Sequence, residues 1–530
     1  MTITETRPGA VSASSIAQPQ ARGTVFTTGD HKQLGRLLLL FGLMSIVAGC
    51  VLAALYQSPV GAERATAWTD GASRVSSAAV TATFVLGLPA VWLGLLAIVV
   101  PLQLGATRAS LPRLQATAVW GFITGAVVVA AAYVFDAPSG PNLGSTFPLV
   151  GAEGDRANDV TLLLLAGLML VAVSTALAAV SLLVTVLTQR AEGMTLLRMP
   201  VLAWSALAGS TVLLLSAGGF FSGLFVTYLD RRYGGSLFGE AGGFRIWQHQ
   251  MWQLGRPEAF LYAALGIGAF CDVVATHSRR PLVAFPIARA LAIATIFATL
   301  LAWAANTSAL SSPVAPVGTP AQGLIAIPAA LTVLVWMASL RRGAKLHPSL
   351  LFAAGFVLLL AVPGLVAGAA ALAGVEADGV ESMRNGQITV LMLGAPLLAV
   401  AGALAHWSPK VWGSRTSPLS VVQLLVLLGG IVLFAGPAYA IGFGLDEDIA
   451  VVGSIGALVV AAGVAVSLLS ALQGRKAGAR ADAPDDGGGG GLTLEWATAS
   501  PPPAHNFDAI PPIRSAHPLH DERETQGVPA

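Results

Sequence analysis

The fold of this chain is decided by an apolar stretch near its start, LGRLLLLFGLMSIVAGCVLAAL at residues 34–55. Its length of about 20 residues is what an α-helix needs to cross the roughly 30 Å hydrocarbon core of a bilayer. It is longer than the apolar region of a secretory signal peptide, which holds about 7–15 residues. We therefore interpret this stretch as a helix that anchors the chain in a membrane.

Similar apolar runs recur along the rest of the chain, and they indicate an all-α polytopic membrane protein. Of the 530 residues, 55% are hydrophobic and only 11% are charged, with a mean hydropathy of +0.73. Soluble domains carry about 25% charged residues. The net charge of +2 and the absence of a basic stripe argue against a nucleic-acid partner. We expect twelve spans, near residues 34–55, 77–101, 115–136, 160–187, 200–228, 246–275, 282–310, 322–340, 348–374, 387–407, 418–440 and 449–472.

The charges between the spans support this count, because Lys and Arg collect on the cytoplasmic side of membrane proteins. Loops after even-numbered spans are basic, whereas loops after odd-numbered spans are acidic. The alternation predicts a multi-pass protein of the cell membrane with both termini in the cytoplasm. It divides the chain into a cytoplasmic segment (1–33), a twelve-helix membrane domain (34–472) and a Gly- and Pro-rich cytoplasmic tail (473–530).

Short motifs between the spans follow an order that resembles subunit I of the haem-copper oxidases, the catalytic subunit of cytochrome c oxidase, in its actinobacterial form. The motifs are GDHK (29–32), PLQLGA (101–106) with PRL (112–114), RAEGMT (190–195) with RMP (198–200), WQHQMWQLGRPE (247–258), SRRP (278–281), TLEWATASPPP (493–503) and IPP (510–512). The resemblance covers nearly the whole chain. It implies the family's twelve-helix fold and a place in the respiratory chain.

The resemblance also implies haem and copper, which the family holds with six histidines because neutral imidazole suits both metals. This chain has eight histidines, and none lies in the middle of a predicted span. The resemblance places the three haem-ligand positions at Ala79, with Ala78 as the alternative, and at Gln387 and Thr389. We therefore predict no haem ligand at these positions.

The copper-ligand positions are replaced in the same way, by Arg256, Ala305 and Asn306. The family's WAHH becomes Trp303-Ala304-Ala305-Asn306, and its cross-linked tyrosine becomes Phe260. We therefore predict no bound copper and no catalytic residue.

Other family positions are changed as well. Glu447 and Asp448 stand where an arginine pair meets the haem propionates. The two entrances for protons are replaced by Arg108 and by Thr332, which is followed by Trp336. The family's buried glutamate is retained as Glu258, which alone cannot pump protons.

Arg256 and Glu258 are nevertheless an ionisable pair at membrane depth, where a charge costs about 2.5–3.5 kcal/mol and marks a candidate functional site. Two residues apart on a helix, they point to different faces and do not pair directly. Trp252 and Phe260 flank Arg256 at spacings of four, so cation–π contacts offset its charge if it fills the volume left by copper. Arg256 is then a structural filler and Glu258 an inert neutral acid.

Three functions follow from these residues. The leading hypothesis is a catalytically inactive subunit I-like protein, a pseudoenzyme that acts as a structural or assembly partner of other oxidase subunits in a respiratory membrane complex. The second is an active terminal oxidase with substitute ligands such as Met251 or Met392. The third is a pathway for protons or a small solute through the vacated cavities past Glu258, although no inverted repeat supports it.

Overall fold

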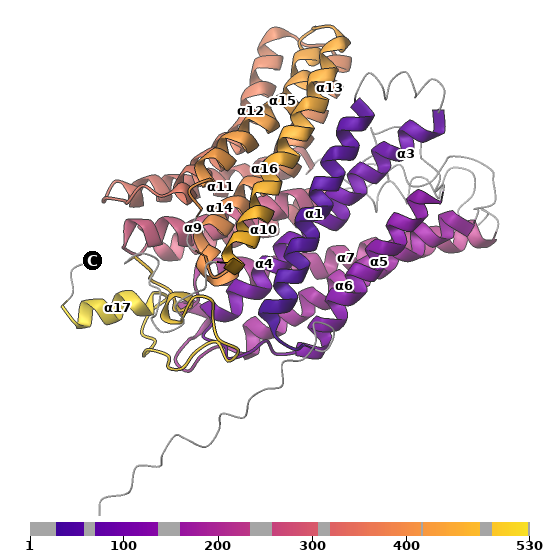
Figure 1. Ribbon diagram of the computed structural model, residues 1–530. Coiled ribbons are helices and arrows are strands. Elements are labelled where there is room, and N and C mark those ends of the chain that lie inside the picture. The colour runs from indigo at the N-terminus through magenta and orange to yellow at the C-terminus, as the bar shows by residue number, and fades with distance from the viewer. Residues whose placement is uncertain are drawn as a thin grey trace, which may run out of the picture.

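The computed structural model describes residues 28–57, 69–135, 159–233, 257–305, 318–414, 417–476 and 490–527, and every regular element in these ranges is helical. Figure 1 shows the helices as one bundle, with the C-terminal tail in yellow at the end opposite the tops of α12, α13 and α15. The longer helices are α1 (His31–Gln57), α3 (Thr69–Val80), α4 (Leu88–Gln103), α5 (Pro112–Val134), α6 (Asp159–Thr188), α7 (Val201–Tyr233), α9 (Pro257–Ser278), α10 (Phe285–Ala305), α11 (Gly318–Leu340), α12 (Pro348–Ala373), α13 (Ala377–Ile388), α14 (Ala395–Val411), α15 (Ser420–Gly442), α16 (Ala450–Lys476) and α17 (Pro518–Thr525).

The all-α membrane fold expected from the sequence is confirmed. Ten helical stretches are long and apolar enough to cross a membrane, and α10 and α11 add two shorter apolar helices. The second span is longer than expected, at Val75–Gln103, and so is the tenth, at Ser382–Val411. The predicted start of the sixth span, residues 246–256, lies outside the described residues. The protein is therefore an all-α, multi-pass membrane protein.

Helices α1 and α4 pack backbone to backbone through glycines. Gly35 and Gly42 of α1 are two turns apart and face the carbonyl oxygens of Gly94 and Gly87. A Cβ atom added at either α1 glycine would come within 2.7 Å of the facing carbonyl oxygen. Small residues permit such close approach in membranes, where the hydrophobic drive for helix association is weak. The two helices leave no room for a cofactor along this line.

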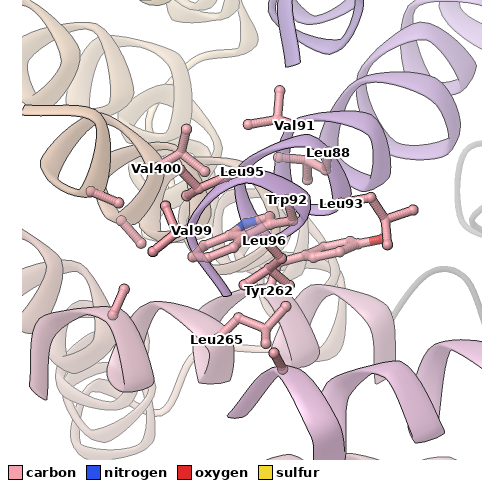
Figure 2. Close-up of a cluster of buried hydrophobic side chains, with 14 of the residues drawn as sticks. Leu88, Val91, Trp92, Leu93, Leu95, Leu96, Val99, Tyr262, Leu265 and Val400 are labelled. Carbon is pink, nitrogen blue, oxygen red and sulfur yellow. The ribbon is translucent and has the colours of Figure 1, made fainter. Parts of the chain in front are cut away.

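The centre of the bundle is formed by α4, α9 and α14. Figure 2 shows the indole of Trp92, on α4, beside the ring of Tyr262, on α9. Both side chains are almost completely buried, and Val400 of α14 lies in the same cluster. Only a minority of the most apolar stretch of α12, in contrast, is buried within the chain. The central helices are apolar all round because they face protein on every side.

The second and tenth spans each contain a π-helical turn. The turn η1 (Thr81–Gly87) joins α3 to α4, and η5 (Thr389–Gly394) joins α13 to α14. The two turns also contact each other across the bundle. Such bulges occur often at functional positions in helices. Here they lie next to the positions that the sequence assigned to haem ligands.

Candidate functional site

The haem-ligand position on the second span, Ala79, lies where two helices pack backbone to backbone. Ala79 lies two residues before η1, and 5% of its surface is exposed. Gly49 of α1 faces it so closely that a Cβ there would come 2.9 Å from the carbonyl oxygen of Ala79 and would collide with the hydroxyl of Thr83. Ala79 therefore offers a methyl group in a tightly packed interface.

The two haem-ligand positions on the tenth span are polar but are not imidazoles. The hydroxyl of Thr389 donates to the carbonyl oxygen of Asn385, 3.1 Å away on the same helix. Gln387 is half-buried, and its neighbour Gly386 packs against the ring of Tyr439. Haem iron in proteins is held by His, Cys, Met or Tyr. The residues at all three positions therefore do not fit a histidine-ligated haem.

The copper-ligand positions lie at the edge of the described residues. Ala305 is the last residue of α10 and has no donor atom in its side chain. Arg256, Asn306 and Trp252 lie outside the described residues. Within the described ranges, no three His, Cys, Asp or Glu side chains form a group that could hold a metal ion.

Three further residues that the sequence singled out lie in helices of the described ranges. Glu258 and Phe260 are in the first turn of α9, and Trp303 is near the end of α10. The helical start at Pro257 agrees with proline's preference for a first turn, where its missing N–H is not needed. The expected cation–π contact of Arg256 with Phe260, and its lack of a direct pair with Glu258, stay predictions, because Arg256 lies outside the described residues.

Trp336 and Thr332 on α11 are structural side chains in this fold. The indole N–H of Trp336 donates to the Sγ atom of Cys271 over 3.3 Å, and its ring stands edge-on to Phe270. The hydroxyl of Thr332 donates to the carbonyl oxygen of Pro328 in its own helix, 2.8 Å away. A threonine bonded in this way has no free proton to pass along the helix.

The densest polar chemistry instead lies where the C-terminal tail meets the ends of α4, α9 and α14. The Nε2 atom of Gln103 donates to Asp272 Oδ2 over 2.9 Å and to Glu495 Oε1 over 3.1 Å. The indole N–H of Trp407 also donates to Glu495 Oε1, over 3.2 Å. Both carboxyl groups are buried. The side-chain amide of Gln103 thus joins Asp272 of α9 to Glu495 of the tail.

Two buried lysines, one from α1 and one from α14, bind the same tail segment. Lys410 Nζ donates to the Thr498 carbonyl oxygen over 2.7 Å and to Ser500 Oγ over 2.8 Å. Lys32 Nζ donates to Asn506 Oδ1 over 2.7 Å and forms an ion pair with Asp30 over 3.1 Å. Buried ammonium groups require such partners, because an uncompensated charge in the interior is very costly.

Three histidines form a cluster beside this contact. The rings of His277 and His347 stack at 4.3 Å, and the ring of His406 stands edge-on to His277 at 5.3 Å. The Ser349 amide donates to His347 Nδ1, so this nitrogen carries no proton and accepts the Ser349 hydroxyl as well. His277 Nε2 then donates to that hydroxyl over 3.0 Å.

The ionisable groups of the tail and loops respond to this burial. Desolvation raises the pKa of the Glu495 carboxyl above its ordinary value of 4.5. Burial lowers the pKa of His347, and it lowers the pKa of His517 to about 4, with a further contribution from His520. At neutral pH the imidazoles of His347 and His517 are therefore neutral, which matches their apolar surroundings.

Sequence reasoning missed most of this contact. Asp272 is an acid within the sixth apolar run, and Lys410 lies just after the tenth. A charged residue at such a place indicates a candidate polar site, so both could have been found from the sequence. Glu495 lies inside the TLEWATASPPP motif, but nothing in the motif indicated that its side chain enters the bundle. Gln103 joins Asp272 to Glu495, and these acids lie 169 and 392 positions further along the chain, a separation that no local pattern reveals.

The fold and this contact define a twelve-helix membrane protein with a docked C-terminal tail. The family model for cytochrome c and quinol oxidase polypeptide I matches residues 33–453. Because this match covers most of the chain, the protein belongs to that family, the haem-copper oxidase subunit I family. The recognition made from the motifs is confirmed at this level.

Individual relatives agree with this assignment. The chain is 27% identical to a putative cytochrome c oxidase subunit 1-beta of Streptomyces coelicolor, over 93% of this chain and 89% of the relative. It is 28% identical to a haem-copper oxidase subunit I+III of Aeropyrum pernix, over 92% of this chain and 62% of that longer protein. A solved haem-copper terminal oxidase dimer shares the fold with a TM-score of 0.64 and 13% identity, covering 93% of this chain and 89% of that chain.

Proposed function

We propose that this protein is a subunit I-like member of the family that does not reduce oxygen, and that it serves as a structural or assembly partner in a respiratory membrane complex. The observation that carries the proposal is the contrast between two sets of family positions. His31 and Lys32 of the GDHK motif bind Asn506 of the tail, and Gln103 of the PLQLGA motif binds Glu495 of the TLEWATASPPP motif. The haem-ligand positions, in contrast, carry side chains that do not fit the group.

This contrast supports a role in which the protein surface is used and the metal chemistry is not. Two buried lysines bind the tail, so this contact contributes to the fold without any metal. Breaking one such buried interaction costs several kcal/mol in typical proteins. The partners we propose are other subunits of an oxidase, and the fused subunit I+III of Aeropyrum pernix shows that subunit I sequences occur joined to a further subunit.

The decisive experiment is a reduced-minus-oxidised visible spectrum of the purified protein, with haem and copper quantified on the same sample. We expect neither cofactor in stoichiometric amount in folded, monodisperse protein. Haem and copper near one equivalent each would contradict the proposal and favour an active oxidase with substitute ligands such as Met392. Oxygen uptake with reduced cytochrome would then be measured on the same preparation.

The assembly role is tested separately. A tagged chain purified in mild detergent is expected to bring down other oxidase subunits, identified by mass spectrometry. Purification of the chain alone, from cells that express those subunits, would remove the support for an assembly role. If flux through liposomes then appeared and vanished in a Glu258→Gln variant, the pathway hypothesis would replace it.

We further propose that both termini lie in the cytoplasm of the cell. The basic loops after even-numbered spans support this orientation. Fusion of a reporter that is active only in the cytoplasm to residue 530 should give active reporter, and an inactive reporter would reverse the topology.

A further inference from the structure

Two loops of the bundle bring five cations together without any acidic residue. The first loop joins α9 to α10 and carries Arg279 and Arg280. The second joins α11 to α12 and carries Arg341, Arg342 and Lys345. We call these five residues the basic loop pair. The two loops are about 60 residues apart in sequence, so only the fold brings their charges together.

Two hydrogen bonds fasten each loop to the helix that precedes the other loop. At one end the amide of Lys345 donates to the carbonyl oxygen of His277 over 3.0 Å. At the other end the amide of Val283 donates to Ser339 Oγ over 3.0 Å. The arginines lie in sequence between these two fastening points. Like charges held together repel one another, so the arrangement favours an anion bound between them.

The backbone of the first loop is constrained as well. Arg279 has φ 56° and Ala284 has φ 52°, a left-handed conformation that residues with a side chain adopt rarely. Strained backbone of this kind persists where the surrounding structure determines it and clusters at ligand-binding positions. The loop is thus held in one shape and is not a free tether.

Most other cations at this end of the bundle already bind carbonyl oxygens. Arg190, Arg198 and Arg289 donate to backbone carbonyl oxygens over 2.6–3.2 Å. Arg280 and Lys345, in contrast, are exposed, and so are Arg341 and Arg342. Among the described residues the side chains of these four have neither a hydrogen-bond nor an ion-pair partner. The acids of α17 do not pair with these four cations: Asp521 accepts from Ser515, Glu522 from Gln526, and Glu524 lies 3.4 Å from His520.

Exposed aliphatic side chains accompany the cations. Leu346 follows Lys345 directly and is 82% exposed, and Ile287 at the start of α10 is 56% exposed. Met337, one turn before Arg341, is also exposed. The cations adjoin the ends of helices that cross the membrane, so these aliphatic groups lie where acyl chains begin.

We propose that the basic loop pair binds the headgroup of an anionic phospholipid, with the arginines on the phosphodiester and Leu346 among the acyl chains. The planar guanidinium group suits a phosphate, because it donates two parallel hydrogen bonds to two of its oxygens. A soluble phosphate compound would use the cations but would gain nothing from the exposed aliphatic groups. This site is independent of whether the protein binds haem.

The test compares two variants that each remove two exposed cations. Arg341→Gln/Arg342→Gln changes the basic loop pair, and Arg108→Gln/Arg113→Gln is the matched control, with Arg108 on the loop after α4 and Arg113 in the first turn of α5. The full-length protein is placed in nanodiscs of phosphatidylcholine with or without phosphatidylglycerol of the same acyl chains. Lipid that remains bound after transfer to detergent is then measured by native mass spectrometry.

We expect the wild type and the control to retain phosphatidylglycerol, and the loop variant to bind it about 30-fold more weakly, from the roughly fivefold that each cation contributes near an anionic surface. An equal loss in both variants would overturn the proposal, because it would indicate general surface charge. So would displacement of the lipid by inorganic phosphate, which would indicate a free phosphate ligand. Loss of a copurifying polypeptide with unchanged lipid would indicate an acidic protein and would also overturn it. Unfolding temperatures of all variants in phosphatidylcholine are expected to be equal.

Discussion

The haem-ligand positions in the bundle and the tail contact at its end are built in opposite ways. At the ligand positions the helices meet through glycines, a methyl group and a hydroxyl that is bonded within its own helix. At the tail, Lys32, Lys410, Gln103 and Glu495 form a network of charged and neutral hydrogen bonds between residues far apart in sequence. Steric fit therefore stabilises the first region, and polar pairing stabilises the second.

The difference shows what each region can lose without unfolding. A packed glycine interface tolerates no added volume but does not depend on charge. A buried polar network tolerates changes of volume at its edge but requires every partner. Four substitutions test this contrast, in order of decreasing expected effect.

Gly42→Val should have the largest effect. Its new Cβ would come within 2.7 Å of the Gly87 carbonyl oxygen and of Val91, so α1 and α4 must separate. We expect a loss of roughly 3 kcal/mol in the free energy of unfolding, measured by unfolding in mixed micelles with sodium dodecyl sulfate. Gly429→Val is the control, because nothing lies within 4 Å of a Cβ there. Equal losses in the two variants would show that the glycine interface has no special role.

Lys410→Met should release the tail. The substitution leaves the Thr498 carbonyl oxygen and the Ser500 hydroxyl without their cationic donor, which costs about 2 kcal/mol for a buried interaction. Limited proteolysis should then cut the chain near residue 500, and Lys410→Arg should restore much of the protection. Arg108→Met removes an exposed cation and should leave the pattern of fragments unchanged. Protection of the tail in the methionine variant would contradict the role given to Lys410.

Glu495→Gln should change how stability depends on pH. The folded-state pKa of Glu495 is raised by burial, so its protonated form is favoured in the folded state. Its contribution is therefore complete below 4.5 and is lost as pH rises through the folded-state pKa, by at most about 1.4 kcal/mol per pH unit. The glutamine variant cannot ionise, so its unfolding free energy should fall less steeply with pH. If the unfolding free energies of the two proteins changed in parallel with pH, the pH dependence would come from a group other than Glu495.

Thr389→Ala should have the smallest effect. The hydroxyl bonds only to Asn385 in its own helix, at a partly exposed position, so the change in unfolding free energy should stay below about 0.5 kcal/mol. The haem content of the purified protein should not change either. A drop in bound haem on this substitution would show that Thr389 lies at a working cofactor site and would remove the contrast between the two regions.

Much of the fold followed from the sequence because each span is long and apolar enough to be recognised by itself. All twelve spans were predicted, and the structure added the π-helical turns η1 and η5, which depend on a local change of hydrogen bonding that hydropathy does not report. The family was recognised from motifs in the loops and in the tail, and the family model confirmed it.

The site was predicted only in part. Replacement of the haem ligands was visible as residue types at Ala79, Gln387 and Thr389, whereas the packing of Gly49 against Ala79 required the fold. The roles of Arg256 and Glu258 remain predictions. The network around Glu495 could not be derived, because its partners come from α4, α9 and α14 and are brought together only when the tail docks.

The bond between Lys32 and the tail also has a consequence for biosynthesis. Lys32 Nζ donates a hydrogen bond to the carbonyl oxygen of Ala504, a residue 472 positions further along the chain. At a translation rate of 5–20 residues per second, roughly 25 to 95 s pass between synthesis of the first partner and of the second. Throughout that interval the cation at the start of α1 has its neighbour Asp30 as an ion-pair partner but lacks the acceptors that the tail provides. Residues made late in synthesis therefore complete the environment of a helix that was made 472 positions earlier.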